Sequence, residues 1–135
     1  ACARWLESNG VSVTALFRDV SKTKDCDIVA KAAQTLRLDV KTWDTKYWDE
    51  MGLCVAFGQL ESLGKKADAI LWCVSPSEFQ AGMQIDLVGW DTIDDVACAP
   101  RRMTGPKGRR QVDNFQIDPP NLRTCADLLV AIKTA

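Results

Sequence analysis

Residues 67–76 read ADAILWCVSP, and this stretch indicates the fold more clearly than any other part of the sequence. Ala69 to Val74 are continuously apolar, and Pro76 ends the run. A strand without polar alternation is usually covered on both faces, as the strands of parallel sheets are. We therefore predict a buried strand here, in a sheet with helices on both of its faces.

Strand and helix patterns alternate on the N-terminal side of this strand. VSVTALF (11–17) and DVKTW (39–43) are predicted strands, and DIVAKAAQTLRL (27–38) and MGLCVAFGQLESLGKK (51–66) are predicted helices. Each strand–helix unit takes about 30 residues, which is the length of a βαβ crossover. This rhythm predicts an α/β fold with a parallel sheet of about five strands and helices on both faces. The remaining predicted elements are strands at 83–90 and 111–117 and a helix at 119–133.

Length and composition fit one globular domain over residues 1–135, with residues 1–10 as an N-terminal extension. Hydrophobic residues make up 47% of the chain and charged residues 26%, close to the globular average. The net charge of −1 provides no overall attraction to nucleic acid or to an anionic membrane. No apolar run reaches the roughly 18 residues that span a bilayer, and the N-terminus has no signal-peptide pattern.

The histidine and cysteine content argues against several kinds of site. The chain has no histidine, so it has neither Ser-His-Asp nor Cys-His catalysis and no histidine metal ligand. Its six cysteines include no CxxC pair, which argues against zinc and against a thioredoxin-type redox site. We expect reduced thiols in a cytoplasmic protein, with a secreted protein held by disulfides as the alternative. We predict no metal and no cofactor.

Acidic and glycine patterns give little support for catalysis. The loop after the first predicted strand, RDVSKTKD (18–25), lacks GxGxxG and GxxxxGK[ST], which argues against nucleotide binding. Asp25 or Asp27 precedes one predicted helix and is placed to cap it. Asp49 and Glu50 precede the next, where the helix dipole favours negative charge. We therefore predict no catalytic residue.

Residues 43–52, WDTKYWDEMG, join aromatic and acidic side chains on a predicted polar loop. Large aromatic residues in such a place are typical of protein–protein hot spots. The sequence predicts an interaction surface here, made of Trp43, Asp44, Tyr47, Trp48, Asp49 and Glu50.

The segment RRMTGPKGRR (101–110) is strongly basic and contains glycine and proline. It is either a binding site for an acidic partner or a solvated loop. No aromatic side chains are interleaved for base stacking, which weakens a nucleic-acid interpretation, and we predict no nucleic-acid partner. The cationic residues are Arg101, Arg102, Lys107, Arg109 and Arg110.

The stretch from Leu38 to Pro76 resembles the SEFIR domain, the TIR-like cytoplasmic module of interleukin-17 receptors and their adaptor. The resembling features are a strand that ends in Trp43, a Glu-Met-Gly at 50–52 that opens a helix, and a Lys-Lys-Ala-Asp turn at 65–68 before the apolar strand. The likeness covers roughly residues 11–80 and implies a flavodoxin-like, TIR-like parallel sheet. The chain departs from the family after Pro76, where receptor domains carry an insert and a helix.

The resemblance implies a signalling module and not an enzyme. Such a module docks with other SEFIR or TIR-like domains to pass a cytokine-receptor signal to an adaptor, and reaches the membrane only through a parent receptor. The implied contact surface also includes Ser77, Glu78 and Phe79. Two alternatives stay open: a secreted, disulfide-stabilised binding protein, and a TIR-type enzyme that cleaves NAD with Glu78. The aromatic-Cys-x-x-Glu pattern of such enzymes is missing at Glu78, which argues against the second.

Overall fold

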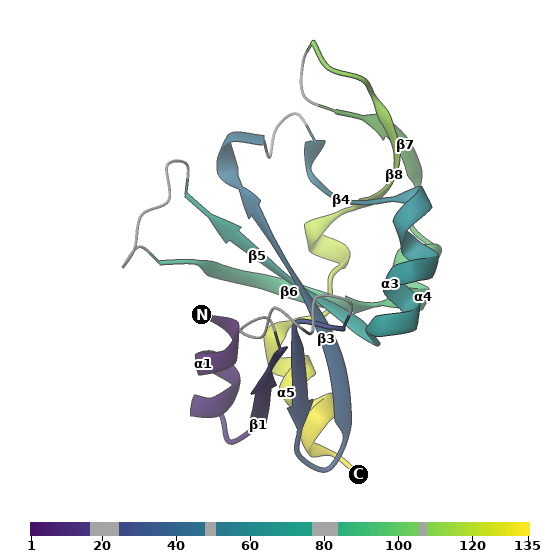
Figure 1. Cartoon of the computed structure of the whole chain (residues 1–135). Helices are drawn as coiled ribbons and strands as arrows, with labels where there is room; N and C mark the ends of the chain where they lie inside the picture. Colours follow the sequence, from purple (N-terminus) through teal and green to yellow (C-terminus); the bar gives the residue numbers. More distant parts are fainter. Residues whose placement is uncertain (17–24, 48–50, 77–83, 106–107) are drawn as a thin grey trace.

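The described residues form two β-sheets of unequal size (Figure 1). A computed structural model describes residues 1–16, 25–47, 51–76, 84–105 and 108–135. The larger sheet has five strands, in the spatial order β1 (Ser12–Ala15), β2 (Ile28–Lys31), β3 (Thr35–Asp44), β5 (Ala69–Ser75) and β6 (Asp86–Thr92).

Strand directions in the larger sheet are mixed. β1, β2 and β3 form an antiparallel meander, β3 and β5 are parallel, and β6 runs antiparallel to β5. The predicted flavodoxin-like, TIR-like parallel sheet is therefore wrong. The reason lies in the connections: residues 32–34 alone join β2 to β3, and a parallel pair needs a crossover of a dozen residues or more.

The smaller sheet holds three strands with antiparallel pairing. Their order is β4 (Leu53–Ala56), β8 (Val112–Ile117) and β7 (Arg101–Thr104). β4 lies between β3 and β5 in the sequence, yet it pairs with β8, with Leu53 opposite Ile117. The connection from β3 to β5 thus carries a strand of a different sheet as well as a helix.

Two hydrophobic cores lie on the two faces of the larger sheet. On one face, α1 (Cys2–Ser8) and α5 (Cys125–Lys133) bury Leu6, Leu128 and Ile132 against Leu71. On the other, α3 (Leu60–Lys66), α4 (Ile93–Ala97) and the smaller sheet pack around Trp72. Among the helices that the structure describes, none is long and apolar enough to cross a membrane.

The predicted helix at 27–38 is wrong, because these residues form the β2–β3 hairpin. Ile28 and Ala30 are fully buried while Lys31 is exposed, so the burial has the period of two that a strand requires. The turn between the strands has no glycine, proline or asparagine to mark it. The turn is stabilised by a residue far away in the sequence, since Gln34 N–H donates to the Ile132 carbonyl of α5 (2.8 Å).

Most of the other predicted elements agree with the structure, at least in part. The strands at 67–76, 83–90 and 111–117 are confirmed as β5, β6 and β8. β5 is covered on both faces as predicted, with Leu71 in one core and Trp72 in the other. The predicted helix at 51–66 is half right, because β4 and the 3-10 turn η4 (Phe57–Gln59) precede α3. The predicted helix at 119–133 divides into η5 (Pro119–Asn121) and α5.

Candidate active site

β3 carries three charged side chains, Arg37, Asp39 and Lys41, on the face that packs toward α3. Strand alternation turns Leu38 and Val40 toward the α1–α5 core, so Asp39 and Lys41 lie on the opposite face. Asp39 is only 7% exposed, and its Oδ2 atom lies 3.4 Å from Lys41 Nζ. Lys66 at the end of α3 brings its Nζ within 3.9 Å of Asp39 Oδ1. A nearly buried carboxylate thus sits between two ammonium groups.

Asp27 lies beside Asp39, where β2 and β3 separate. Its N–H donates to the Leu38 carbonyl (3.1 Å), which continues the ladder of the hairpin by one step. The next bond comes from the side chain instead of the backbone: Val40 N–H donates to Asp27 Oδ2 at 2.8 Å. Asp27, just before β2, therefore bonds to the two residues that bracket Asp39.

The electrostatics of Asp39 reflect these neighbours. Burial raises the pKa of the Asp39 carboxyl above its ordinary value, and the charge of Asp27 adds to the rise. The ammonium groups of Lys41 and Lys66 oppose it. The pKa of Asp39 stays raised on balance, so a further cation would be favourable at this position.

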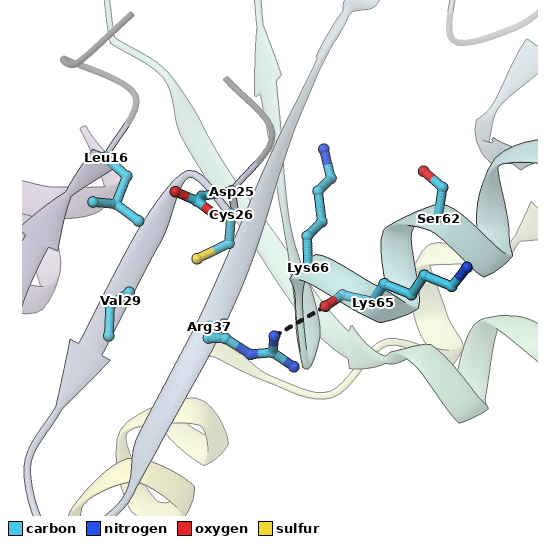
Figure 2. Close-up of a pocket in the computed structure, with 8 residues that line it drawn as sticks. All are labelled: Leu16, Asp25, Cys26, Val29, Arg37, Ser62, Lys65 and Lys66. Carbon is cyan, nitrogen blue, oxygen red and sulfur yellow. Dashed lines mark hydrogen bonds between the residues drawn. The ribbon is translucent and has the colours of Figure 1, made fainter. Parts of the chain in front are cut away.

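A surface hollow opens over this cluster. A cavity of about 290 Å³ is lined by Asp39, Lys41 and Lys66 together with Gln59 and Ser62 of the helical segment. Two further hollows share residues with it and extend it along β3. One, of about 490 Å³, shares Ser62 and Lys66 and is drawn in Figure 2. The other, of about 620 Å³, shares Lys41 and Gln59 and reaches the smaller sheet at Thr104 and Asn114, with Arg110 of the β7–β8 connection also in its lining.

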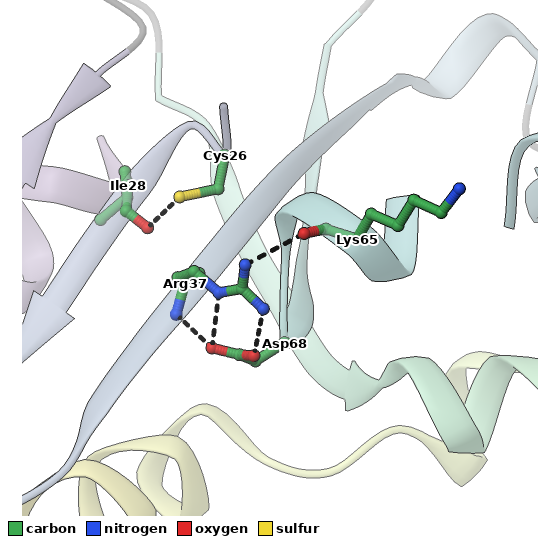
Figure 3. Close-up of polar contacts among 5 residues, drawn as sticks. All are labelled: Cys26, Ile28, Arg37, Lys65 and Asp68. Carbon is green, nitrogen blue, oxygen red and sulfur yellow. Dashed lines mark hydrogen bonds and ion pairs between the residues drawn. The ribbon is translucent and has the colours of Figure 1, made fainter. Parts of the chain in front are cut away.

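Arg37 fixes the helix that carries Lys65 and Lys66 (Figure 3). Its guanidinium donates to both carboxylate oxygens of Asp68, at 2.9 and 3.3 Å, and to the Lys65 carbonyl at 3.1 Å. The Arg37 N–H donates to the same carboxylate at 2.8 Å, and Arg37 holds the pKa of Asp68 below its ordinary value. β3, the end of α3 and the start of β5 are thereby joined at one point, which sets where Lys66 stands above Asp39.

This cluster of carboxylates and ammonium groups has the chemical groups that bind a divalent cation and a phosphate. Carboxylate oxygens are the ligands that Mg²⁺ prefers, and it is bound through one or two carboxylates with several waters retained. Lysines beside such a site attract phosphate oxygens. Within the described ranges, no group of three or more acidic, cysteine or histidine side chains could hold a metal ion. The candidate site consists of Asp27, Asp39 and Lys41, with Lys66 at its edge.

The predicted interaction surface at 43–50 is only partly visible. Trp43 and Asp44 end β3 and are half-buried, and Trp43 lines the same hollow as Lys41. Asp44 Oδ1 accepts the N–H of Lys46 at 2.8 Å. Tyr47 ends the 3-10 turn η3 (Thr45–Tyr47). The other predicted contact residues lie outside the described residues: Trp48, Asp49, Glu50, Ser77, Glu78 and Phe79.

The first four residues of the predicted basic loop at 101–110 form a strand. Arg101 and Arg102 belong to β7, and Arg101 pairs with Asp113 of β8 and stacks over the Phe57 ring, 3.7 Å from its centre. Arg109 and Arg110 are exposed, and Lys107 lies outside the described residues.

Sequence reasoning missed the residues that the fold brings together. Asp27 was interpreted as a helix cap, and Asp39 and Lys41 as part of an ordinary strand. The missed signal is a charged pair at positions i and i+2 within apolar neighbours, because such a pair shares one face of a strand. Ionised side chains are almost never fully buried without a partner or a task.

Comparison with solved structures gives an informative likeness of fold. No protein-family model matches the sequence, and no curated protein matches it. The fold is similar to that of Hjc, a Holliday junction resolvase of the archaeal hyperthermophile Archaeoglobus fulgidus. The TM-score is 0.53, the identity is 14%, and the match covers 97% of this chain and 94% of that one.

This likeness overturns the SEFIR interpretation and what it implied. The fold is that of a resolvase and not of a SEFIR domain, so this finding contradicts the predictions of a cytokine-receptor signalling module and of SEFIR or TIR-like partners. It also conflicts with the predictions of no enzymatic activity and of no nucleic-acid partner, because a resolvase is a nuclease. The alternatives are not supported either: all six cysteines are free thiols, and the fold is not of the TIR kind. The SEFIR resemblance rested on the order of short motifs between Leu38 and Pro76. That order does not determine the directions of the strands, so it did not distinguish a parallel sheet from a mixed one.

Proposed function

We propose that this chain is a nuclease that cleaves phosphodiester bonds in DNA with the help of a divalent cation. The observation that carries the proposal is the nearly buried carboxylate of Asp39 beside Lys41, in a hollow that Lys66 also lines. Asp27, just before β2, adds a second carboxylate next to Asp39. The same fold in a Holliday junction resolvase supports this choice of substrate.

The two carboxylates would hold the cation. Asp39 is desolvated by burial, which strengthens its attraction for a positive charge, and the pKa of its carboxyl would fall on binding. Asp27 accepts the Val40 N–H through Oδ2, which fixes the orientation of its carboxylate. A bound Mg²⁺ supplies Lewis-acid stabilisation of the phosphoryl oxygens and lowers the pKa of a bound water.

Lys41 would act on the phosphate itself. Its ammonium group is held next to Asp39, on the strand that borders three joined hollows. A positive charge fixed there stabilises the charge that develops on the phosphoryl oxygens during cleavage. Lys66 approaches Asp39 from α3 and would help to attract the negatively charged strand.

Local cations, and not the net charge, would bind the nucleic acid. The chain carries a formal charge of −1, so the polyanion gains nothing from the protein as a whole. Lys65 and Lys66 line one of the hollows that adjoin the hollow over Asp39 (Figure 2), and Arg110 lines another. A phosphate backbone laid along β3 would meet these charges in turn.

The test is cleavage of end-labelled DNA as a four-way junction, as linear duplex and as single strand. We expect products with Mg²⁺ or Mn²⁺ and none with a chelator. Asp39→Asn and Asp27→Asn should each lower the rate by about 100-fold or more, since they remove cation ligands. Asp91→Asn is the matched control, because Asp91 is equally buried in the same sheet but away from the hollow over Asp39.

The control should cleave at the wild-type rate. If no DNA form is cut with any divalent cation, the proposal fails. It also fails if Asp39→Asn, checked for folding by circular dichroism, cuts as fast as the wild type. The preferred DNA form identifies the substrate class.

A further inference from the structure

Two buried cysteines from distant parts of the chain touch each other. Cys2 Sγ of α1 lies 3.2 Å from Cys73 Sγ of β5, and 71 positions separate them in the sequence. Both are buried in the core under α1 and α5, and both are free thiols. At this distance one thiol hydrogen-bonds to the other, and a modest approach would bring the sulfurs to the roughly 2.05 Å of a disulfide.

The pair borders a cavity although it is buried. A space of about 270 Å³ is lined by Cys2 and Cys73 together with Asp27, Val40 and Ile85. A water molecule takes about 30 Å³ of liquid volume, so a small oxidant such as hydrogen peroxide fits there. Asp27 lines the same cavity, which lies on the face of the sheet opposite to Asp39 and Lys41.

The two thiols differ in acidity. The hydrogen bond from Cys73 lowers the pKa of Cys2 in spite of its burial, and the same contact together with burial raises the pKa of Cys73. The thiolate is the reactive form of cysteine, so Cys2 is the better nucleophile of the pair. Cys73 stands in contact with it and is placed to react second.

We propose that Cys2 and Cys73 form an oxidisable pair that a hydroperoxide converts into a disulfide. The Cys2 thiolate attacks one oxygen of the peroxide, the O–O bond breaks, and a sulfenic acid and hydroxide form. The Cys73 sulfur then attacks the Cys2 sulfur, the S–O bond breaks, and the Cys73 proton leaves with the oxygen as water. Two thiols and one peroxide give one disulfide and two waters.

The disulfide would tie α1 to β5 across the cavity that Asp27 lines. Closing so long a loop restricts the unfolded chain, so we expect the oxidised protein to melt several degrees higher than the reduced protein. This inference does not depend on the proposed nuclease function, because it rests on the sulfur contact and the cavity alone.

The experiment treats the folded protein with millimolar hydrogen peroxide, blocks free thiols, and maps the tryptic peptides by mass without reductant. It is done in a Cys98→Ser background, because Cys73 and Cys98 share the tryptic peptide 67–101. We expect a crosslinked species of the peptide ACAR (1–4) with peptide 67–101, lighter than the sum by two hydrogen atoms. Dithiothreitol should reverse both the link and the rise in melting temperature.

Matched variants complete the design. Cys2→Ser and Cys73→Ser should each abolish the link and the thermal shift, whereas Cys125→Ser should keep both, although Cys125 packs against the same core. The proposal is overturned if Cys2 and Cys73 both remain free to alkylation after peroxide. It is equally overturned if Cys2 is joined to Cys125 or to a second molecule, or is oxidised without a partner.

Discussion

Two buried aspartates stand in one row of the larger sheet, and their surroundings differ. Asp39 of β3 pairs with Ile70 of β5, and Ile70 pairs with Asp91 of β6, so both carboxylates lie on the face toward α3 and α4. Asp39 is 7% exposed and Asp91 5%, and burial raises the pKa of both. The pKa of Asp91 rises to about 6.

Their partners set the two apart. Asp91 accepts the indole N–H of Trp72 at 2.9 Å, a neutral donor on a rigid ring that is fully buried. The arginine near it, Arg123, is already paired with Asp95 at 2.9 Å. Asp39 faces two flexible ammonium groups and a second carboxylate. The Trp72 indole is a fixed hydrogen-bond donor for the Asp91 carboxylate. The ammonium groups beside Asp39 are on flexible side chains, so a bound ligand can replace them as partners of the carboxylate. Equal burial of the two aspartates therefore does not indicate an equal role.

The strongest test of this contrast is Lys41→Ala. We expect DNA cleavage to fall by about 100-fold to 1000-fold, the cost of removing one charge that stabilises a transition state. Rates are compared under single-turnover conditions with saturating Mg²⁺. Lys66→Ala is the control at similar distance from Asp39 and should lose much less, since it would act mainly in attraction. Equal losses in the two variants would remove the special role given to Lys41.

Asp91→Asn should stabilise the protein in a pH-dependent way. The folded pKa of about 6 lies above the unfolded value of about 3.9, so the contribution of Asp91 is fully present below about pH 4 and is lost as the pH rises through 6. The amide keeps an oxygen for Trp72 and carries no charge. We expect a gain of ~3 kcal/mol at pH 8 and none at pH 4, measured by urea unfolding. A gain that does not vary with pH would contradict this account.

Gly89→Ala should weaken the cover over Asp91. A methyl group at Gly89 would stand 2.7 Å from the Arg123 carbonyl and 2.9 Å from Leu122 Cβ, both part of the segment that bridges to Trp90. We expect a loss of about 1–3 kcal/mol in unfolding free energy, the usual cost of overpacking. Gly58→Ala is the control, because nothing lies within 4 Å of that position. Equal stability of the two variants would show that the segment moves freely.

Asp68→Asn should have the smallest effect. The pair with Arg37 is about two-fifths exposed on both sides, so solvent screening limits it to about 1 kcal/mol or less. The lowered pKa of Asp68 means that its contribution is present above the unfolded value near 4 and is lost as the pH falls through the folded value. The difference in melting temperature between variant and wild type should therefore be smaller at about pH 3 than at about pH 7. A larger loss at pH 3 would be inconsistent with this pair.

Part of this fold could be predicted from the sequence, and the successes share a cause. β5 and β8 are apolar strands whose signal is local, and β5 is so apolar that burial on both faces follows. The β2–β3 hairpin was not predicted, because its alanine-rich sequence fits a helix and its turn has no typical turn residues. The bond from Gln34 to Ile132 that holds the turn joins residues far apart in the chain, which no local pattern reveals.

The candidate site was not predicted from the sequence, for a related reason. Asp39 and Lys41 are two positions apart, so their common face could be predicted once the strand was recognised. The position of Asp27 could not be predicted, because it depends on the β2–β3 hairpin. The sequence analysis had predicted a helix for those residues. Lys66 comes from a helix after an intervening strand, and the packing of α3 together with the Arg37–Asp68 contact places it there.

The position of β4 has a consequence for how the chain folds. Leu53 and Val55 are almost wholly buried, but the partner strand β8 begins at Val112, so β4 keeps an open edge until most of the chain is available. Contacts between such distant segments slow folding, because a long loop must close before they form. A fragment that stops before residue 112 would carry this unpaired apolar strand in the connection between β3 and β5. We expect such a fragment to aggregate even though the five strands of the larger sheet are complete in it.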